Sequence, residues 1–463
     1  MIELKGKYTN AKIFIDDVEA GVFEQVYSII NSQVSDGLKV RIMPDCHVGS
    51  GICIGLAMEL GKFLHANWCG VDLACGLLGA KFDKNTPIDL EKLELQIRQT
   101  IPTGFNIHNS PVVREMDFDA IQDTANKFVK KYNEKFGTSY SAPIYNQKWL
   151  SDRLKDLKMD EVKFWNSIST MGGSNHFIEI GKDLAGDYWV TVHSGSRNLG
   201  VKVADFWNNV ANGKIKTVSE TYTKELDYIL MNTTPKSDIP KKLKELKDRY
   251  NVGIDKGYLS GDNMMGYLFD MIWCYHYANL SRQTMLELIR VKLGIKKYDD
   301  TISTVHNYID MDDMIIRKGA VKAIKGQRFL LPFNMRDGIL ICEGLSNSDW
   351  LCTSPHGSGR LFSRSEAKKT LDFQKYKKSM EGIVTTSVTR DTIDESPQSY
   401  KSSELIESLI QDTAVVLDRI KPILNIKDLG KAESWKERKN AKKKRDKERE
   451  LNMDAKRRMK RRG

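Results

Sequence analysis

The chain has 463 residues, of which 40% are hydrophobic and 9% aromatic, the composition of a soluble globular protein large enough for a sizeable core. No run approaches the roughly 18 consecutive apolar residues of a membrane helix. Residues 1–7 lack the basic flank and apolar core of a signal peptide. We therefore exclude a membrane partner and expect a cytoplasmic protein.

The number and spacing of the cysteines and the net charge narrow the class of protein further. The seven cysteines are scattered and contain no Cys-x-x-Cys pair, which excludes a disulfide framework. The net charge is +11, but residues 431–463 hold 16 Lys and Arg against 6 Asp and Glu, so this segment alone carries +10. We predict that residues 428–463 form a basic extension, flexible or helical, that binds a polyanionic partner. An extension that only aids solubility is the alternative.

Hydrophobic spacing predicts a mixture of strands and helices along the chain. We predict strands over residues 11–15, 189–193 and 302–309, and helices over residues 22–30, 362–369 and 405–420. Two long stretches, about 85–165 and 203–300, have helical and charged sequences. Within the second stretch we predict a helix pair over 264–289, whose Tyr275, Tyr277 and Met285 belong to the core rather than to an RNA-stacking surface. The fold class is therefore α+β with helical insertions.

The first candidate site residues lie in two segments that each contain an aspartate. Asp45 and His47 flank Cys46, where a histidine and a carboxylate could serve a metal or a substrate; a turn aspartate and a structural histidine are the alternative. Asp72 lies among small and apolar residues, where an ionised carboxylate needs a positive partner. Asp72 and Cys75 can converge on one divalent ion, and a thiolate with imidazoles suits zinc, manganese or cobalt better than magnesium. A capping aspartate and an unrelated buried cysteine would explain the same pattern.

Two histidines further along the chain each lie beside a glycine turn. His176 follows Gly172 and Gly173 and enters a strand-like run, so that His176 and Ile178 face opposite Phe177 and Glu179. His193 ends a predicted strand just before Ser194-Gly195-Ser196-Arg197. These positions are typical of metal ligands, and Arg197 would then reach a phosphate. A structural histidine is the alternative at each position.

The segment Thr353-Ser354-Pro355-His356-Gly357-Ser358-Gly359-Arg360 has the composition of an anion-binding loop. Its two glycines permit close backbone approach, Ser358 adds a hydroxyl, and Arg360 offers a fork of donors to phosphate oxygens. We predict that His356 is a nucleophile in this loop. A surface turn that contains His-Gly-x-Gly by chance is the alternative.

The ordered set of these segments resembles the RtcB-type RNA ligases. The matching blocks cover residues 43–49, 72–75, 172–179, 193–197, 306–307, 317–320, 356–360 and 396–401. The resemblance covers roughly residues 1–427 and implies a single catalytic domain with mixed β-sheets around a central metal cleft, followed by the basic extension.

The resemblance also implies ligands and cofactors. Cys75 would bridge two Mn²⁺ ions, one held with His193 and His306 and the other with Asp72 and His176. GTP would supply the energy, and Arg197 and Arg360 would hold phosphates. The guanosine and loop contacts implied are those of Asn175, Phe177, Glu179, Ser358, Gly359, Tyr400, Lys427 and, more loosely, Asn334.

The reaction implied is the joining of RNA ends, for tRNA splicing or repair. One end carries a 2′,3′-cyclic phosphate or a 3′-phosphate, the other a 5′-hydroxyl, and His356 would be guanylylated on the way. We expect a monomer; the sequence leaves open whether an activating protein partner is needed. Two departures from the family pattern are residues 332–335, which read Pro-Phe-Asn-Met, and Asp428 in place of a glycine. A metal-dependent phosphoesterase or cyclic phosphodiesterase and a non-catalytic RNA-binding protein are the alternatives.

Overall fold

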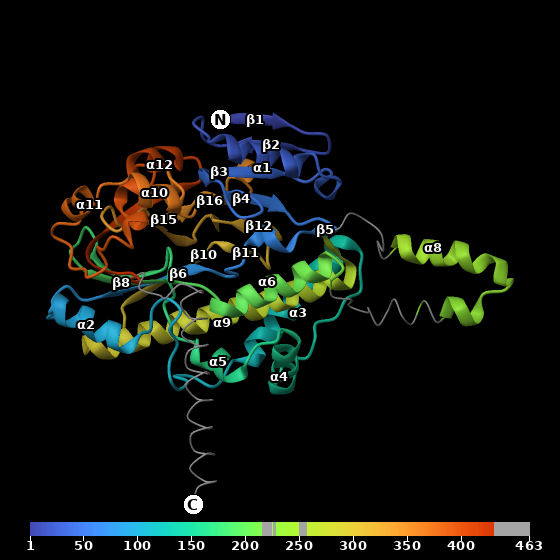
Figure 1. The fold of residues 1–463 in the computed structure, drawn as a ribbon, viewed down its shortest axis with the longest axis horizontal. Helices are drawn as coiled ribbons and strands as arrows, with labels where there is room; N and C mark the ends of the chain where they lie inside the picture. The colour runs from blue at the N-terminus through green and yellow to red at the C-terminus, as the bar shows by residue number, and fades with distance from the viewer. Residues whose placement is uncertain (215–224, 226–227, 250–256, 430–463) are drawn as a thin grey trace, which may run out of the picture.

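The computed structural model describes residues 1–214, 225, 228–249 and 257–429, and within them it shows two large β-sheets backed by helices, with two small two-stranded sheets (Figure 1). The predicted basic extension falls outside the described residues except for Asp428 and Leu429. None of the helices in the described ranges has the length and apolarity of a membrane span. The α+β class, with mixed sheets and helical insertions in a single domain, is confirmed.

The first sheet has six strands and contains the N-terminus. Its strands, in spatial order, are β1 (Ile2–Lys5), β2 (Asn10–Ile13), β3 (Val40–His47), β4 (Ile54–Glu59), β12 (Ile315–Lys318) and β11 (Asn307–Ile309). Strands β2 and β3 pair in parallel and the other neighbours are antiparallel. Helix α1 (Ala20–Ile30) packs on this sheet through Val22, Val26 and Ile29. The strand and helix predicted near the N-terminus are therefore confirmed.

The second sheet has seven strands and is antiparallel throughout. Its spatial order is β10 (Asp300–Val305), β6 (Gly76–Phe82), β8 (Tyr188–Ser194), β7 (Phe177–Lys182), β17 (Ala414–Ile426), β15 (Ile339–Gly344) and β14 (Arg328–Pro332). Ile178 and Ile180 of β7 lie in a core cluster with Val190 and Val192 of β8. The alternate residues of both strands face the other side, where the candidate site lies.

In the described residues both long stretches are mainly helical, as predicted, and several of their helices pack against one central helix, α9 (Gly261–Leu293). Helices α3 and α6 contact α9, and Figure 1 shows α4 and α5 on the same side of the sheets. Each of the helices α2 to α5 starts with an Asp or Asn side chain that accepts a backbone N–H of the first turn. The helices are α2 (Leu90–Thr100), α3 (Phe118–Phe136), α4 (Gln147–Asp156), α5 (Glu161–Asn166), α6 (Arg197–Ala211) and α8 (Ile239–Arg249).

The remaining elements are short and flank the candidate site. Strand β13 pairs with β16, which leads into the predicted anion-binding loop, and β5 pairs with β9. Their bounds are β5 (Phe63–Leu64), β9 (Leu259–Ser260), β13 (Ala320–Lys322) and β16 (Thr353–Pro355), followed by α10 (Arg364–Thr370), α11 (Phe373–Ser379) and α12 (Ser403–Leu409).

Four element predictions need correction. The predicted helix pair over 264–289 is the single helix α9, because no proline interrupts it; Tyr277 and Met285 are buried in it, as predicted. The predicted helix over 405–420 is helical only up to Leu409, in α12, and residues 414–420 belong to β17. The helix predicted from residue 362 begins at Arg364. The strand predicted over 302–309 is divided at His306 into β10 and β11.

Candidate active site

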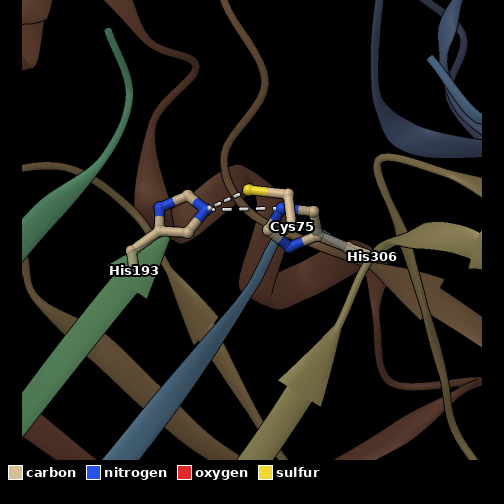
Figure 2. Close-up of side chains that lie close together, drawn as sticks. All are labelled: Cys75, His193 and His306. Atoms are coloured by element: carbon tan, nitrogen blue, oxygen red, sulfur yellow. Dashed lines mark hydrogen bonds between the residues drawn. The ribbon is translucent and has the colours of Figure 1, made fainter. Parts of the chain in front are cut away.

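The candidate metal ligands lie where the two sheets meet. His306 stands between β10, an edge of the seven-stranded sheet, and β11, an edge of the six-stranded sheet. Cys75 directly precedes β6, and His193 lies near the end of β8, paired with Leu77 of β6. Figure 2 shows the three side chains converging from these separate strands. The chain passes from one sheet to the other at His306, and this places the His306 imidazole beside the candidate ligands Cys75 and His193.

The donor atoms of these three residues face one another (Figure 2). The Cys75 Sγ atom lies 3.3 Å from His193 Nε2, and His193 Nε2 lies 3.3 Å from His306 Nε2. All three residues are less than 5% exposed. Lone-pair donors that are buried this close together suit a shared cation.

A second group shares Cys75. Its Sγ lies 3.3 Å from His176 Nε2, and the same Nε2 lies 2.8 Å from Asp72 Oδ2. Within each of the groups Cys75–His193–His306 and Asp72–Cys75–His176, the ligand atoms lie within 4.8 Å of one another. The structure therefore brings all five predicted ligands together, with the cysteine common to both groups.

Burial sets the protonation of this cluster. Burial and the neighbouring imidazoles lower the pKa of His193 well below its ordinary value, and burial does the same for His306, so both rings are neutral. Burial, together with the Asp72 carboxylate, raises the pKa of the Cys75 thiol well above its ordinary value. Burial would also raise the pKa of Asp72, but His176 and Arg197 lower it overall. Without a cation Cys75 keeps its proton, and a bound cation would displace it.

The ligand loops are held from behind by a buried arginine of α9. Arg282 is 1% exposed, and its Nη1 donates to the carbonyl of Ala74 at 2.9 Å and to the carbonyl of Ser194 at 2.7 Å. These carbonyls adjoin Cys75 and His193. Arg282 therefore fixes the backbone of two ligand segments with one guanidinium group.

The predicted nucleophile lies next to the metal cluster and is held by Asp45. The His356 ring packs on the His306 ring with 4.8 Å between centroids. Asp45 Oδ2 accepts both the His356 Nδ1–H, at 2.6 Å, and the His356 backbone N–H, at 3.1 Å. Asp45 is fully buried, so this carboxylate selects the tautomer that leaves the lone pair on Nε2.

The backbone around Asp45 fits closely against the predicted anion-binding loop. Gly359 has φ +72°, and a Cβ atom there would lie 2.2 Å from the Asp45 carbonyl oxygen, so only glycine fits. Lys401 Nζ donates to the carbonyls of Pro44 and Cys46, both at 2.9 Å. His47 lines the cavity beside His356, and burial lowers its pKa to about 4. The segment that carries Asp45 is therefore held firmly against the loop that carries His356.

A cavity of about 630 Å³ opens in front of His356, His193 and His306. One wall is the open face of the second sheet, formed by Phe177 and Glu179 of β7 and by Asn425 and Lys427 at the end of β17. Burial raises the pKa of Glu179 to about 8, although Asn425 and Lys427 act in the opposite direction. The cavity is large enough for a nucleotide.

The charge opposite Lys427 comes from Glu395, a residue that the motifs did not single out. Glu395 Oε2 accepts from Lys427 Nζ at 2.7 Å and from the Tyr400 hydroxyl at 2.8 Å. Burial would raise the pKa of Glu395, but Lys427, Arg364 and Arg360 together lower it to about 2. A sequence signal existed, because an acidic pair at 394–395 directly precedes the matching block at 396–401.

Of the other residues predicted to contact guanosine or phosphate, some line the cavity and others do not. Asn175, Ser358, Tyr400 and Arg360 line the cavity. Asn334 also lines it, but its Oδ1 accepts the backbone N–H groups of Arg336 and Asp337 within its own turn. Arg197 does not line the cavity in the described structure; it donates to Thr170 Oγ1 and the Gly104 carbonyl behind the metal cluster.

The donors of Arg360 are already engaged. Its guanidinium donates to the carbonyls of Phe362 and Asp394, at 3.1 and 2.6 Å, and lies over the Tyr400 ring. A phosphate at Arg360 would therefore have to share or replace these partners.

Comparisons with known proteins agree with this geometry. The family model of tRNA-splicing ligase RtcB matches residues 31–428. The RNA-splicing ligase RtcB of Escherichia coli is 24% identical over 405 residues, covering 84% of this chain and 90% of the relative. The tRNA-splicing ligases RtcB of Aeropyrum pernix and Methanococcus maripaludis are 23% and 21% identical, covering 82% and 89% of this chain and 86% and 92% of the relatives. The chain therefore belongs to the RtcB family.

Proposed function

We propose that the protein is an RNA ligase that joins a 2′,3′-cyclic phosphate or 3′-phosphate end to a 5′-hydroxyl end, with GTP as the energy source. The observation that carries the proposal is the position of His356: Asp45 holds its Nδ1, and its ring lies between a cluster of five candidate metal ligands and a nucleotide-sized cavity. Family membership supports the same reaction class.

The donor set fits two divalent ions of the manganese class. Cys75 would bridge them, with His193 and His306 on one ion and Asp72 and His176 on the other. Burial lowers the pKa of His193 and His306, which favours the neutral imidazole that ligation requires, and the Nε2 atoms of His176 and His193 each lie 3.3 Å from the Cys75 thiol. When bound, the ions would neutralise charge on the phosphates beside His356.

His356 would act as the nucleophile. Its Nε2 attacks the α-phosphorus of GTP, a P–N bond forms, the bond to the β-phosphate breaks and pyrophosphate leaves. Asp45 holds the Nδ1–H throughout and stabilises the positive charge that develops on the ring. The product is a guanylylated histidine.

The remaining steps transfer this activation to RNA. Water opens a 2′,3′-cyclic phosphate to a 3′-phosphate, and an oxygen of that phosphate attacks the guanylylated histidine, which breaks the P–N bond. The 5′-hydroxyl then attacks the RNA 3′-phosphorus and GMP leaves. Phe177, Glu179, Tyr400 and Lys427 would hold the guanosine, because they form one wall beside His356.

The test is incubation with GTP labelled at the α-phosphate, in Mn²⁺, followed by denaturing electrophoresis. We expect covalent label that is acid-labile and alkali-stable, and that is absent from His356→Ala. His276→Asn is the matched control, because His276 hydrogen-bonds Thr124 away from the cavity. Label that persists in His356→Ala would contradict the assignment. Opening of cyclic phosphates without any labelling would instead support a metal-dependent phosphodiesterase.

A further inference from the structure

Two polar side chains form a pair on the cavity wall, where neighbouring strands lie side by side. Glu179 of β7 stands directly opposite Asn425 of β17 in the antiparallel register, so both side chains project from the same face of the sheet. Both line the cavity, and they are 2% and 1% exposed. Phe177 and Lys427 lie two residues away on the same face, with Lys427 Nζ 5.5 Å from the centre of the Phe177 ring.

The hydrogen bonds of this pair are incomplete. Asn425 Nδ2 donates to Glu179 Oε2 at 2.8 Å, an orientation that turns the Asn425 Oδ1 acceptor away from this bond. Asn425 Oδ1 and Glu179 Oε1 are buried and find no donor among the residues that the structure describes. Buried acceptors without donors destabilise a protein, and at a binding cavity they indicate a ligand that supplies the donors.

We propose that Asn425 is a specificity-determining residue whose Oδ1 accepts the exocyclic 2-amino group of guanine. The inference rests on the proposed use of GTP and deepens it. Guanine presents two adjacent donors, N1–H and the 2-amino group, which match the two buried acceptors, while its O6 can accept from the Lys427 ammonium. The family resemblance assigned Glu179 and Lys427 to guanosine but gave Asn425 no role.

Inosine triphosphate tests the contact directly, because it keeps N1–H and O6 and lacks only the 2-amino group. We expect the wild-type protein to form the His356 adduct from GTP about 10-fold more efficiently than from ITP, the effect of one hydrogen bond to a neutral acceptor. Both nucleotides are α-labelled and compared at subsaturating concentration in the same Mn²⁺ buffer. Equal labelling by the two nucleotides would overturn the inference and leave the proposed ligase intact.

The Asn425→Ala variant separates this contact from general disruption of the wall. Loss of the Nδ2 bond to Glu179 should weaken labelling by both nucleotides, because both present N1–H to Glu179. Loss of the Oδ1 acceptor should weaken labelling by GTP alone. We therefore expect the GTP-to-ITP ratio to fall close to 1, whatever happens to the absolute rates. A ratio that stays at the wild-type value would overturn the role of Asn425.

Two further outcomes are distinguishable. If Asn425→Ala does not fold, the wild-type ratio alone decides, since it needs no variant. If neither nucleotide labels the wild-type protein, the proposed function itself fails and the inference fails with it.

Discussion

Asp45 is the residue on which the chemistry of His356 depends. It is fully buried and accepts two hydrogen bonds from the same histidine, one from the ring and one from the backbone. This arrangement resembles the acid–imidazole pairs in which a carboxylate fixes the tautomer and stabilises the imidazolium without taking the proton. A neutral amide of the same shape would keep the packing and lose that function.

We expect Asp45→Asn to lower the rate of His356 labelling by GTP roughly 100-fold or more, because the amide stabilises the wrong tautomer and leaves developing charge unpaired. Metal content should stay at the wild-type level, since Asp45 touches no metal ligand of the cluster in the described residues. Labelling rates test the effect on His356, and elemental analysis tests the metal content. The exposed Asp36→Asn serves as control. Wild-type labelling by Asp45→Asn would contradict this role.

The sequence could predict the residues that lie in compact motifs, and it missed their partners from elsewhere. Asp72 and Cys75 follow from their apolar surroundings and His176 and His193 from their glycine turns, whereas His306 was predicted only through the family resemblance; all five do meet in the structure. Asn425 and Glu179 are 246 residues apart, so their pairing depends on the order of strands in the second sheet. Glu395 escaped notice for the same reason, because its importance arises only where it meets Lys427.

At the scale of elements, α9 supports the metal centre through Arg282. The guanidinium joins the carbonyls of Ala74 and Ser194, which belong to segments that carry Cys75 and His193. Groups that orient metal ligands typically contribute 10- to 100-fold to metal affinity. Lysine cannot reproduce the arginine's fork of donors in this buried space.

We therefore expect Arg282→Lys to weaken Mn²⁺ binding by roughly 10-fold or more, with a smaller effect on the melting temperature of the metal-free protein. Arg290→Lys, near the end of the same helix and paired with Glu287, is the control for a general effect on α9. Isothermal titration with Mn²⁺ measures the affinity, and scanning calorimetry without metal measures the stability. Equal losses of metal binding in both variants would argue against a positioning role.

The errors in predicting the secondary-structure elements have two different physical origins. The range 405–420 contains apolar residues that fit a helical spacing, but Val415 and Leu417 are exposed and the segment is recruited as β17 between β15 and β7. Tertiary pairing with two neighbouring strands overrides local propensity there. By contrast, the extent of α9 was underestimated because its buried residues surround the whole helix, so no single apolar face marks its length.

At the scale of the whole molecule, function depends on the meeting of two sheets built from distant parts of the chain. Cys75, His193, His306 and His356 come from four separate segments and converge at that junction. The described residues up to 429 contain the metal cluster, the cavity and His356. By sequence, however, +10 of the net charge of +11 belongs to residues 431–463, outside this unit.

Because the site residues and most of the net positive charge lie in different parts of the chain, we predict that removal of residues 431–463 affects RNA binding and leaves the reaction with GTP intact. Lysine and arginine side chains that neutralise RNA phosphates release counterions, so binding through residues 431–463 should weaken steeply as salt rises. Deletion of these residues should leave GTP labelling of His356 unchanged, weaken RNA binding at low salt, and flatten the slope of log affinity against log salt. Filter binding across a salt series measures the slope, and a full-length variant with neutral substitutions at 442–445 is the matched control for deletion itself. The same slope in full-length and truncated proteins would show that the extension does not capture RNA.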